Sequence, residues 1–99
     1  MIKHIIFFKL KTYTAEEKKE ILAEMEKRFL DLRSNIQEIR YLEVGKNFNE
    51  REVAFDICLY THFENKVDLD VYQHHSAHKD LLNYLATIDR EIAVVDYEI

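Results

Sequence analysis

The chain has 99 residues, of which 47% are hydrophobic and 33% charged, a composition typical of an ordinary globular protein rather than a disordered one. Its 14 basic and 19 acidic side chains give a formal net charge of −5, which argues against nucleic acid as a partner because phosphate binding requires a basic surface. At this length we expect one domain over residues 1–99, with a core small enough to gain stability from dimerisation.

Cysteine content and apolar run lengths predict where the protein resides. The only cysteine, Cys58, lies between Ile57 and Leu59 and has no partner for an internal disulfide, so we expect a buried, inert thiol in a reducing compartment. The apolar stretch 5–8 is too short for a signal peptide or a membrane span. We therefore expect a cytoplasmic protein that contacts no membrane.

The first half of the chain reads as strand, helix, strand. Residues 2–11 alternate as a strand whose two faces are both largely apolar, which indicates that both faces are covered. Thr14 and Glu17 have the spacing of a capping box, which predicts a helix over about 15–34. A second strand is expected over 38–46, with a bulge or turn at Gly45.

The second half begins with a strand over 53–63, in which apolar and more polar residues alternate. Asn65 is a candidate N-cap for a helix, and Ser76 for another. On one unbroken helix Tyr72 and His78 would be rotated by roughly 120° from each other. A break at Ser76 would bring them together. A final strand is expected over 92–99.

The resulting order, βαββαβ, predicts the α+β ferredoxin-like sandwich, with a four-stranded antiparallel sheet and helices on one face. We place Ile6 and Phe8 on the other, open face, where they would form an apolar patch that monomers rarely expose. The prediction is a homodimer formed through the open sheet face, which Phe8→Asp would disrupt. A ligand pocket is expected between the sheet and the helix break.

The candidate site combines imidazole, phenol and carboxyl groups. An imidazole can accept a proton near neutral pH, and a phenol can donate a hydrogen bond to a carbonyl oxygen that gains negative charge. The catalytic candidates are Tyr72 and His78, acting on an enolisable carbonyl compound. The substrate-binding candidates are His4, Ile6, Phe8, His75 and Asp96. Each also has a structural interpretation, such as core packing for Tyr72 and His4, helix capping for His78, or a surface position for Asp96.

Several segments carry a resemblance to a known family: residues 1–11, 43–47, 63–64, 95–97 and the pattern Tyr72-x-x-His75-x-x-His78. In this order they resemble the stress-responsive A/B barrel (Dabb) family. The resemblance implies a dimeric α/β barrel. It also implies that Tyr72 and His78 match the pair that plant polyketide cyclases use for an intramolecular aldol condensation, with His4 in the same pocket. Ser76 stands where the family usually has proline, and Ile57 where those cyclases have another pocket histidine.

Other chemistries have weaker support. His74 and His78 are four residues apart, but the glutamate of a His-Glu-x-x-His zinc motif is missing. As nucleophiles, Cys58 lacks a visible activating neighbour and Ser76 is expected to cap a helix. We expect no metal and no cofactor. Four functions remain open: a stress-related dimer that binds a small apolar or aromatic carbonyl compound, a cyclase-type acid/base enzyme, a monooxygenase-like barrel, and a fully packed assembly protein.

Overall fold

The computed structural model describes all residues 1–99. Its elements confirm the predicted βαββαβ order, with the second helical segment split in two. In chain order they are β1 (Ile2–Leu10), α1 (Ala15–Asn35), β2 (Tyr41–Lys46), β3 (Ile57–Phe63), α2 (Lys66–His74), α3 (Ser76–Leu85) and β4 (Arg90–Glu98).

Three strands differ from their predicted bounds. β2 begins three residues later than predicted and β3 four residues later, whereas β4 begins two residues earlier. Residues 47–56 form a loop with local turns, in which Ala54 N donates to Arg51 O over 3.0 Å. The alternating pattern at 53–56 therefore belongs to this loop, and Val53 is exposed.

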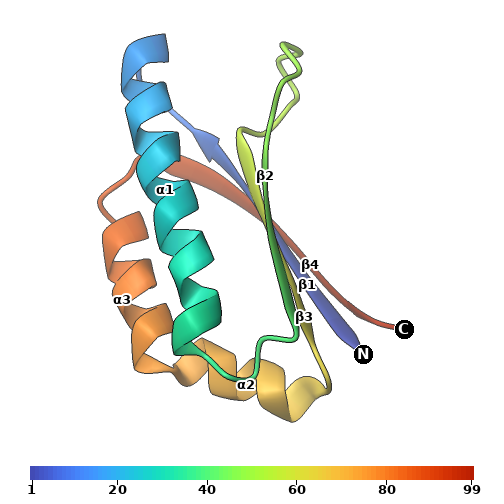
Figure 1. Ribbon diagram of the computed structural model, residues 1–99. Coiled ribbons are helices and arrows are strands. Elements are labelled where there is room, and N and C mark those ends of the chain that lie inside the picture. Colours follow the sequence, from blue (N-terminus) through green and yellow to red (C-terminus); the bar gives the residue numbers. More distant parts are fainter.

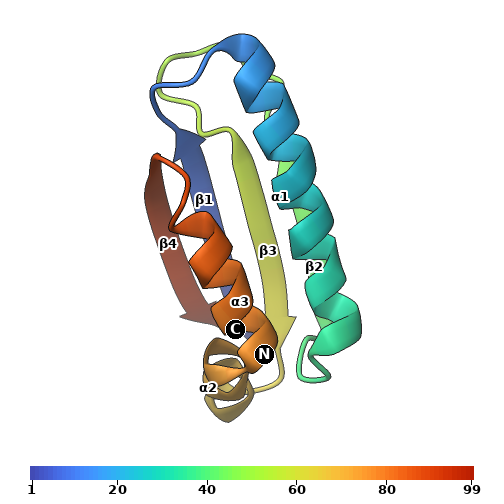
Figure 2. The same cartoon turned by 90° about the vertical axis from the view of Figure 1, so that its left-hand side faces the viewer.

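The four strands form one antiparallel sheet in the order β2-β3-β1-β4. All three helices lie on one face of it (Figure 1), and α1 and α3 run side by side there (Figure 2). This is the predicted ferredoxin-like arrangement. The predicted bulge or turn at Gly45 is wrong: β2 continues through Gly45, which pairs with Cys58 in an unbroken ladder, and Gly45 has no positive φ.

The capping box that predicted the start of α1 is present. Thr14 Oγ1 accepts from Glu17 N over 3.2 Å, and Glu17 Oε1 accepts from Thr14 N over 2.8 Å. Each bond satisfies a backbone donor that the first helical turn leaves unpaired. One face of the helix then buries Met25, Phe29 and Leu32 against the sheet.

The even-numbered residues of β1 face the helices. Phe8 is only 2% exposed, and its ring centroid lies 5.3 Å from that of Phe29 on α1. The prediction that Ile6 and Phe8 lie on the open face is therefore wrong. Alternation separates neighbouring side chains, but because both faces of β1 are apolar, the pattern did not reveal which set meets the helices.

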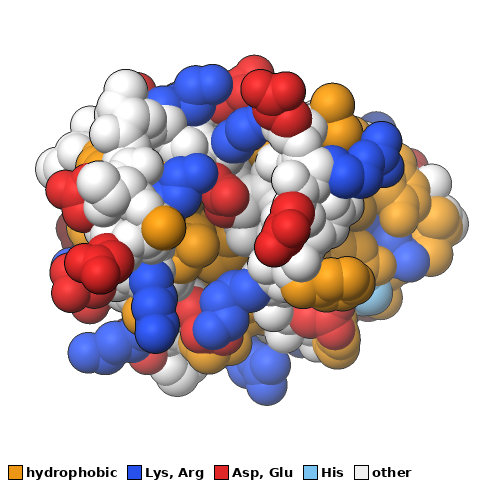
Figure 3. All heavy atoms as spheres, turned by 90° about the horizontal axis from the view of Figure 1, so that it is seen from above, with side chains coloured by type: hydrophobic (Ala, Val, Ile, Leu, Met, Phe, Trp, Pro, Cys, Tyr) orange, Lys and Arg blue, Asp and Glu red, His pale blue; other side chains and the backbone are white.

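The opposite side of the sheet has no helix over it, and we call it the open face. It carries Lys3, Ile5 and Phe7 of β1 together with residues that the register places on the same side of the other strands, among them Tyr41, Cys58, Tyr60, His62, Ala93, Val95 and Tyr97. Seen from above, hydrophobic side chains gather on this side of the molecule (Figure 3).

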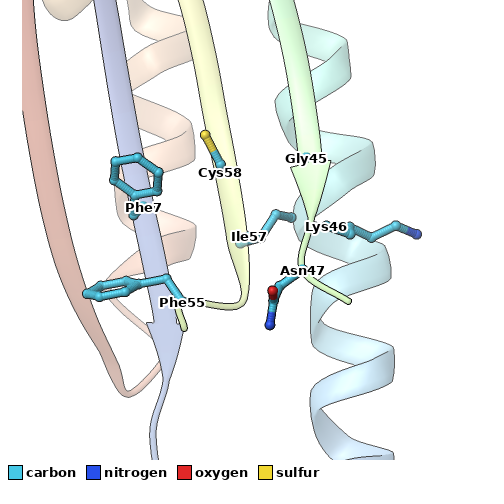
Figure 4. Close-up of a pocket in the computed structure, with 7 residues that line it drawn as sticks. All are labelled: Phe7, Gly45, Lys46, Asn47, Phe55, Ile57 and Cys58. Carbon is cyan, nitrogen blue, oxygen red and sulfur yellow. The ribbon is translucent and has the colours of Figure 1, made fainter. Parts of the chain in front are cut away.

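The open face also contains a shallow hollow of about 470 Å³. Phe7, Phe55 and Cys58 are among the residues around it (Figure 4), and the Phe7 and Phe55 rings meet edge to face with centroids 6.3 Å apart. None of the helices is long and apolar enough to cross a membrane.

Candidate functional site

The break between α2 and α3 builds one end of the candidate site. Asn65 caps α2 by accepting from Asp68 N over 2.9 Å, as predicted. α3 begins at Ser76, and its N-cap is His75, whose Nδ1 accepts from Ala77 N over 3.0 Å. The break is confirmed, but the prediction of Ser76 as the cap is wrong by one residue, because an imidazole nitrogen fills the role expected of a hydroxyl oxygen.

This break brings the predicted tyrosine and histidines together. The ring centroid of Tyr72 lies 4.6 Å from that of His78 and 6.0 Å from that of His4. All three side chains are buried, and Phe63 packs against Tyr72 at 4.9 Å. Three groups that can exchange protons or hydrogen bonds thus meet where β1 approaches the helix break.

His4 is held by a carboxylate from the neighbouring strand. It pairs with Asp96 in the β1–β4 register, and its Nδ1 hydrogen-bonds Asp96 Oδ1. A carboxylate accepts but does not donate, so His4 Nδ1 carries the proton and a neutral His4 has its lone pair on Nε2. Asp96 itself lies on an edge strand and its side chain is 42% exposed.

His78 is held in the same tautomer by a backbone carbonyl. Its Nδ1 donates to Gln73 O over 3.2 Å, which leaves Nε2 with the lone pair. Burial lowers the pKa of His78, the nearby His4 lowers it further, and the bond to Gln73 opposes both effects. His78 is therefore neutral at pH 7 and has a nitrogen able to accept a proton.

Tyr72 carries a hydroxyl with no partner. The side chain is fully buried, and its Oη makes no hydrogen bond within the protein. Burial raises the pKa of Tyr72 well above its usual value, so the side chain remains a neutral phenol that can donate. Leaving a buried hydroxyl unpaired costs about 1–3 kcal/mol, which a bound acceptor would recover.

A cavity of about 270 Å³ lies between α3 and β4, next to these groups. Of the predicted substrate-binding residues, His4, Ile6, Phe8 and Asp96 line it, as does the catalytic candidate His78. Tyr72, whose ring packs against those of His78 and His4, is not in the lining. His75 caps α3 and does not reach the cavity.

Sequence reasoning missed more than half of the cavity wall. The additional lining residues are Leu59, Gln73, Leu81, Leu82, Leu85, Arg90, Ile92 and Val94. Period-two alternation places Arg90, Ile92 and Val94 on the same face of β4 as Asp96, so the β4 members of this set were open to prediction once Asp96 was chosen. The contribution of α3 depends on tertiary packing.

Neither a metal site nor a reactive Cys58 gains support from the geometry. The structure brings together no group of three His, Cys, Asp or Glu side chains that could hold a metal ion. Burial raises the pKa of the Cys58 thiol, which favours the unreactive form. His74 is exposed, whereas His62 is half-buried between strand neighbours on the open face.

Comparison with known proteins identifies the family. The model of the Stress Responsive A/B Barrel Domain (Dabb) matches residues 2–99. The chain belongs to this family. A dimeric protein of unknown function with a ferredoxin-like fold, from Bacteroides fragilis, is 35% identical, with a TM-score of 0.89 over 99% of this chain and 95% of that one.

Two other proteins are similar to this chain, one in sequence and one in structure. An uncharacterised protein of Streptomyces coelicolor is 29% identical over 79 residues, which cover 80% of each chain. The hydroxynitrile lyase of Passiflora edulis is 15% identical, with a TM-score of 0.82 over 99% of this chain and 92% of the lyase. The second likeness is one of fold alone.

Proposed function

We propose that this Dabb protein binds a small apolar or aromatic carbonyl compound in the cavity between α3 and β4. The observation that carries the proposal is a largely apolar cavity lined by His4 and His78, with the buried and unpartnered hydroxyl of Tyr72 on a ring that packs against both imidazoles. A carbonyl oxygen accepts hydrogen bonds and cannot donate them, so it suits a phenol whose own proton is free.

The walls of the cavity support the apolar part of this ligand. Aliphatic and aromatic side chains make up most of the lining, and Leu82 and Val94 are 46% and 51% exposed in the free chain. Covering this surface would stabilise a complex by roughly 25 cal/mol for each Å² removed from water. The polar groups would then orient the ligand, and the apolar walls would supply affinity.

We further propose that the chain forms a homodimer through the open face. The support is the apolar surface around Phe7, Val95 and Tyr97, together with the dimeric state of the 35% identical relative. Two such faces packed about a twofold axis would remove both patches from water. The cavity lies on the helix side, so each protomer would keep its own.

Acid/base catalysis is the second candidate function. It is favoured by the bond from His78 Nδ1 to Gln73 O, which leaves Nε2 as the proton acceptor. In an enolisation, Nε2 would take a proton from the carbon next to the carbonyl, the C–H electrons would form the enolate, and Tyr72 would donate to the enolate oxygen. Return of the proton completes the cycle. The hydroxynitrile lyase neighbour indicates that this fold is compatible with lyase chemistry.

Acetophenone provides one experiment for both candidates. Binding is followed by NMR titration, and proton transfer by deuterium exchange into the methyl group in heavy water. His78→Asn retains a donor for Gln73 O but lacks the basic nitrogen, so it should abolish catalysed exchange. His74→Asn changes an exposed histidine four residues earlier, at the end of α2, so it is the matched control and should behave as wild type.

The outcomes separate the two functions. Binding and exchange in wild type, with exchange lost in His78→Asn, would support the enzyme. Binding without exchange would support a binding protein. A wild-type protein that neither binds acetophenone nor exchanges its protons would contradict the proposed carbonyl site.

A further inference from the structure

Arg90 occupies the end of the cavity opposite the histidines. It is the first residue of β4 and pairs with Leu10, whereas Asp96 pairs with His4 near the other end of β1. Both side chains line the same cavity. Asp96 is six positions after Arg90 on the strand, which corresponds to about 20 Å along the backbone.

The guanidinium of Arg90 has few partners. One terminal nitrogen donates to Ile88 O over 3.2 Å, while its Nε is buried without any partner. No carboxylate lies within ion-pair distance of it. Its acidic neighbours in sequence are engaged elsewhere: Glu91 lies 3.8 Å from Lys11, and Asp89 accepts from Thr12.

The cavity therefore has the guanidinium of Arg90 without a counter-ion at one end, and at the other end a carboxylate that already has a partner. Asp96 is the only acidic residue in the lining, and it already bonds His4. A partly buried guanidinium without a counter-ion is unfavourable, and its planar set of donors matches a carboxylate in bidentate geometry.

We propose that Arg90 binds a carboxylate of the ligand. The ligand class is then a carbonyl compound that also carries a carboxylate, with an apolar segment between the two groups. Ile92 and Val94 lie between Arg90 and Asp96 on the same strand face, where this apolar segment would pack. The inference rests on the proposed carbonyl site and specifies its substrate class.

The test uses levulinate and its longer straight-chain homologues, each paired with its methyl ester. Esterification removes the negative charge and keeps the ketone. Calorimetric or NMR titration of wild type should show that, at the chain length that spans the cavity, the acid binds at least about tenfold more tightly than its ester, as expected for a hydrogen-bonded charged pair.

Arg90→Gln should abolish this preference without changing ester affinity, and Arg90→Lys should retain part of it. Arg51→Gln, on the exposed loop, is the matched control and should keep the full preference. The urea midpoint of each variant establishes that it folds.

Two results would overturn the inference. Acid and ester that bind wild type equally, while wild type still binds acetophenone, would reject the role of Arg90 and leave the carbonyl site standing. A wild type that binds neither acids, esters nor acetophenone would reject both.

Discussion

The two faces of the sheet differ in what covers their apolar side chains. On the helix side, Phe8 packs on Phe29, and the remaining space is a cavity lined partly by His4 and His78. On the open face, the adjacent Phe7 meets Phe55 edge to face beside a shallow hollow. The helices of this chain cover one face, and we propose that a small molecule fills its cavity. We propose that a second copy of the chain covers the open face.

Removing Phe8 should have the largest effect. Phe8→Ala deletes a fully packed ring from the core and should lower the free energy of unfolding by about 3–5 kcal/mol. Urea denaturation followed by circular dichroism measures this. Phe48, which is 98% exposed, gives the control: Phe48→Ala should leave the midpoint unchanged. Similar midpoints for the two variants would contradict the assignment of the faces.

Phe7→Asp should act on assembly rather than on the fold. A carboxylate placed in the proposed interface would weaken the dimer by about 3 kcal/mol or more, since a charge buried without a partner is costly. Sedimentation velocity should show monomers with retained secondary structure. The same charge at Val67, which is exposed on α2, should leave the dimer intact. A dimeric Phe7→Asp protein would exclude the open face as the interface.

Tyr72→Phe should separate stability from binding. It removes a buried hydroxyl that has no partner, so the free protein should be as stable as wild type or more stable by about 1 kcal/mol. Acetophenone affinity should fall about tenfold because its oxygen loses a donor. Tyr84→Phe, on the same side of the molecule but half-buried, should change neither property. A marked loss of stability in Tyr72→Phe would indicate that the hydroxyl serves the fold.

The smallest expected effect is a pH dependence of stability from His78. Its pKa in the folded protein lies below 6.5, so the unfolded chain binds the proton first as the pH falls. The free energy of unfolding should be highest above pH 6.5. It should decline below pH 6.5 and level off once the pH falls below the pKa of His78 in the folded protein. His78→Asn should flatten this decline relative to His74→Asn when urea midpoints are compared at neutral and mildly acidic pH. Equal declines would mean that His78 is not desolvated.

Much of the fold was predictable because it is encoded locally. The Thr14–Glu17 capping box, the Asn65 cap and the alternation of β1 and β3 each depend on residues close in sequence. The direction in which β1 faces was not predictable in this way. Both of its faces are apolar, so only the packing of Phe29 on Phe8 distinguishes them.

The candidate site was partly predictable for a related reason. The helix break that joins Tyr72 to His78 follows from local capping signals, although His75 rather than Ser76 provides the cap. Arg90 and Gln73 were missed because their roles depend on the cavity, which forms only when α3 packs beside β4. Arg90 has no carboxylate partner because Glu91 pairs with Lys11 and Asp89 bonds Thr12, and these contacts too form only in the folded chain.

The most direct test of a carbonyl-binding site beside Tyr72 and His78 is the carbonyl ¹³C chemical shift of labelled acetophenone. It is measured for acetophenone bound to wild type and to Tyr72→Phe. A hydrogen bond from the buried phenol withdraws electron density from the carbonyl carbon, so we expect a downfield shift in the wild-type complex that is lost in the variant. The same shift in both complexes, or no bound signal in wild type, would contradict a carbonyl site beside Tyr72 and His78.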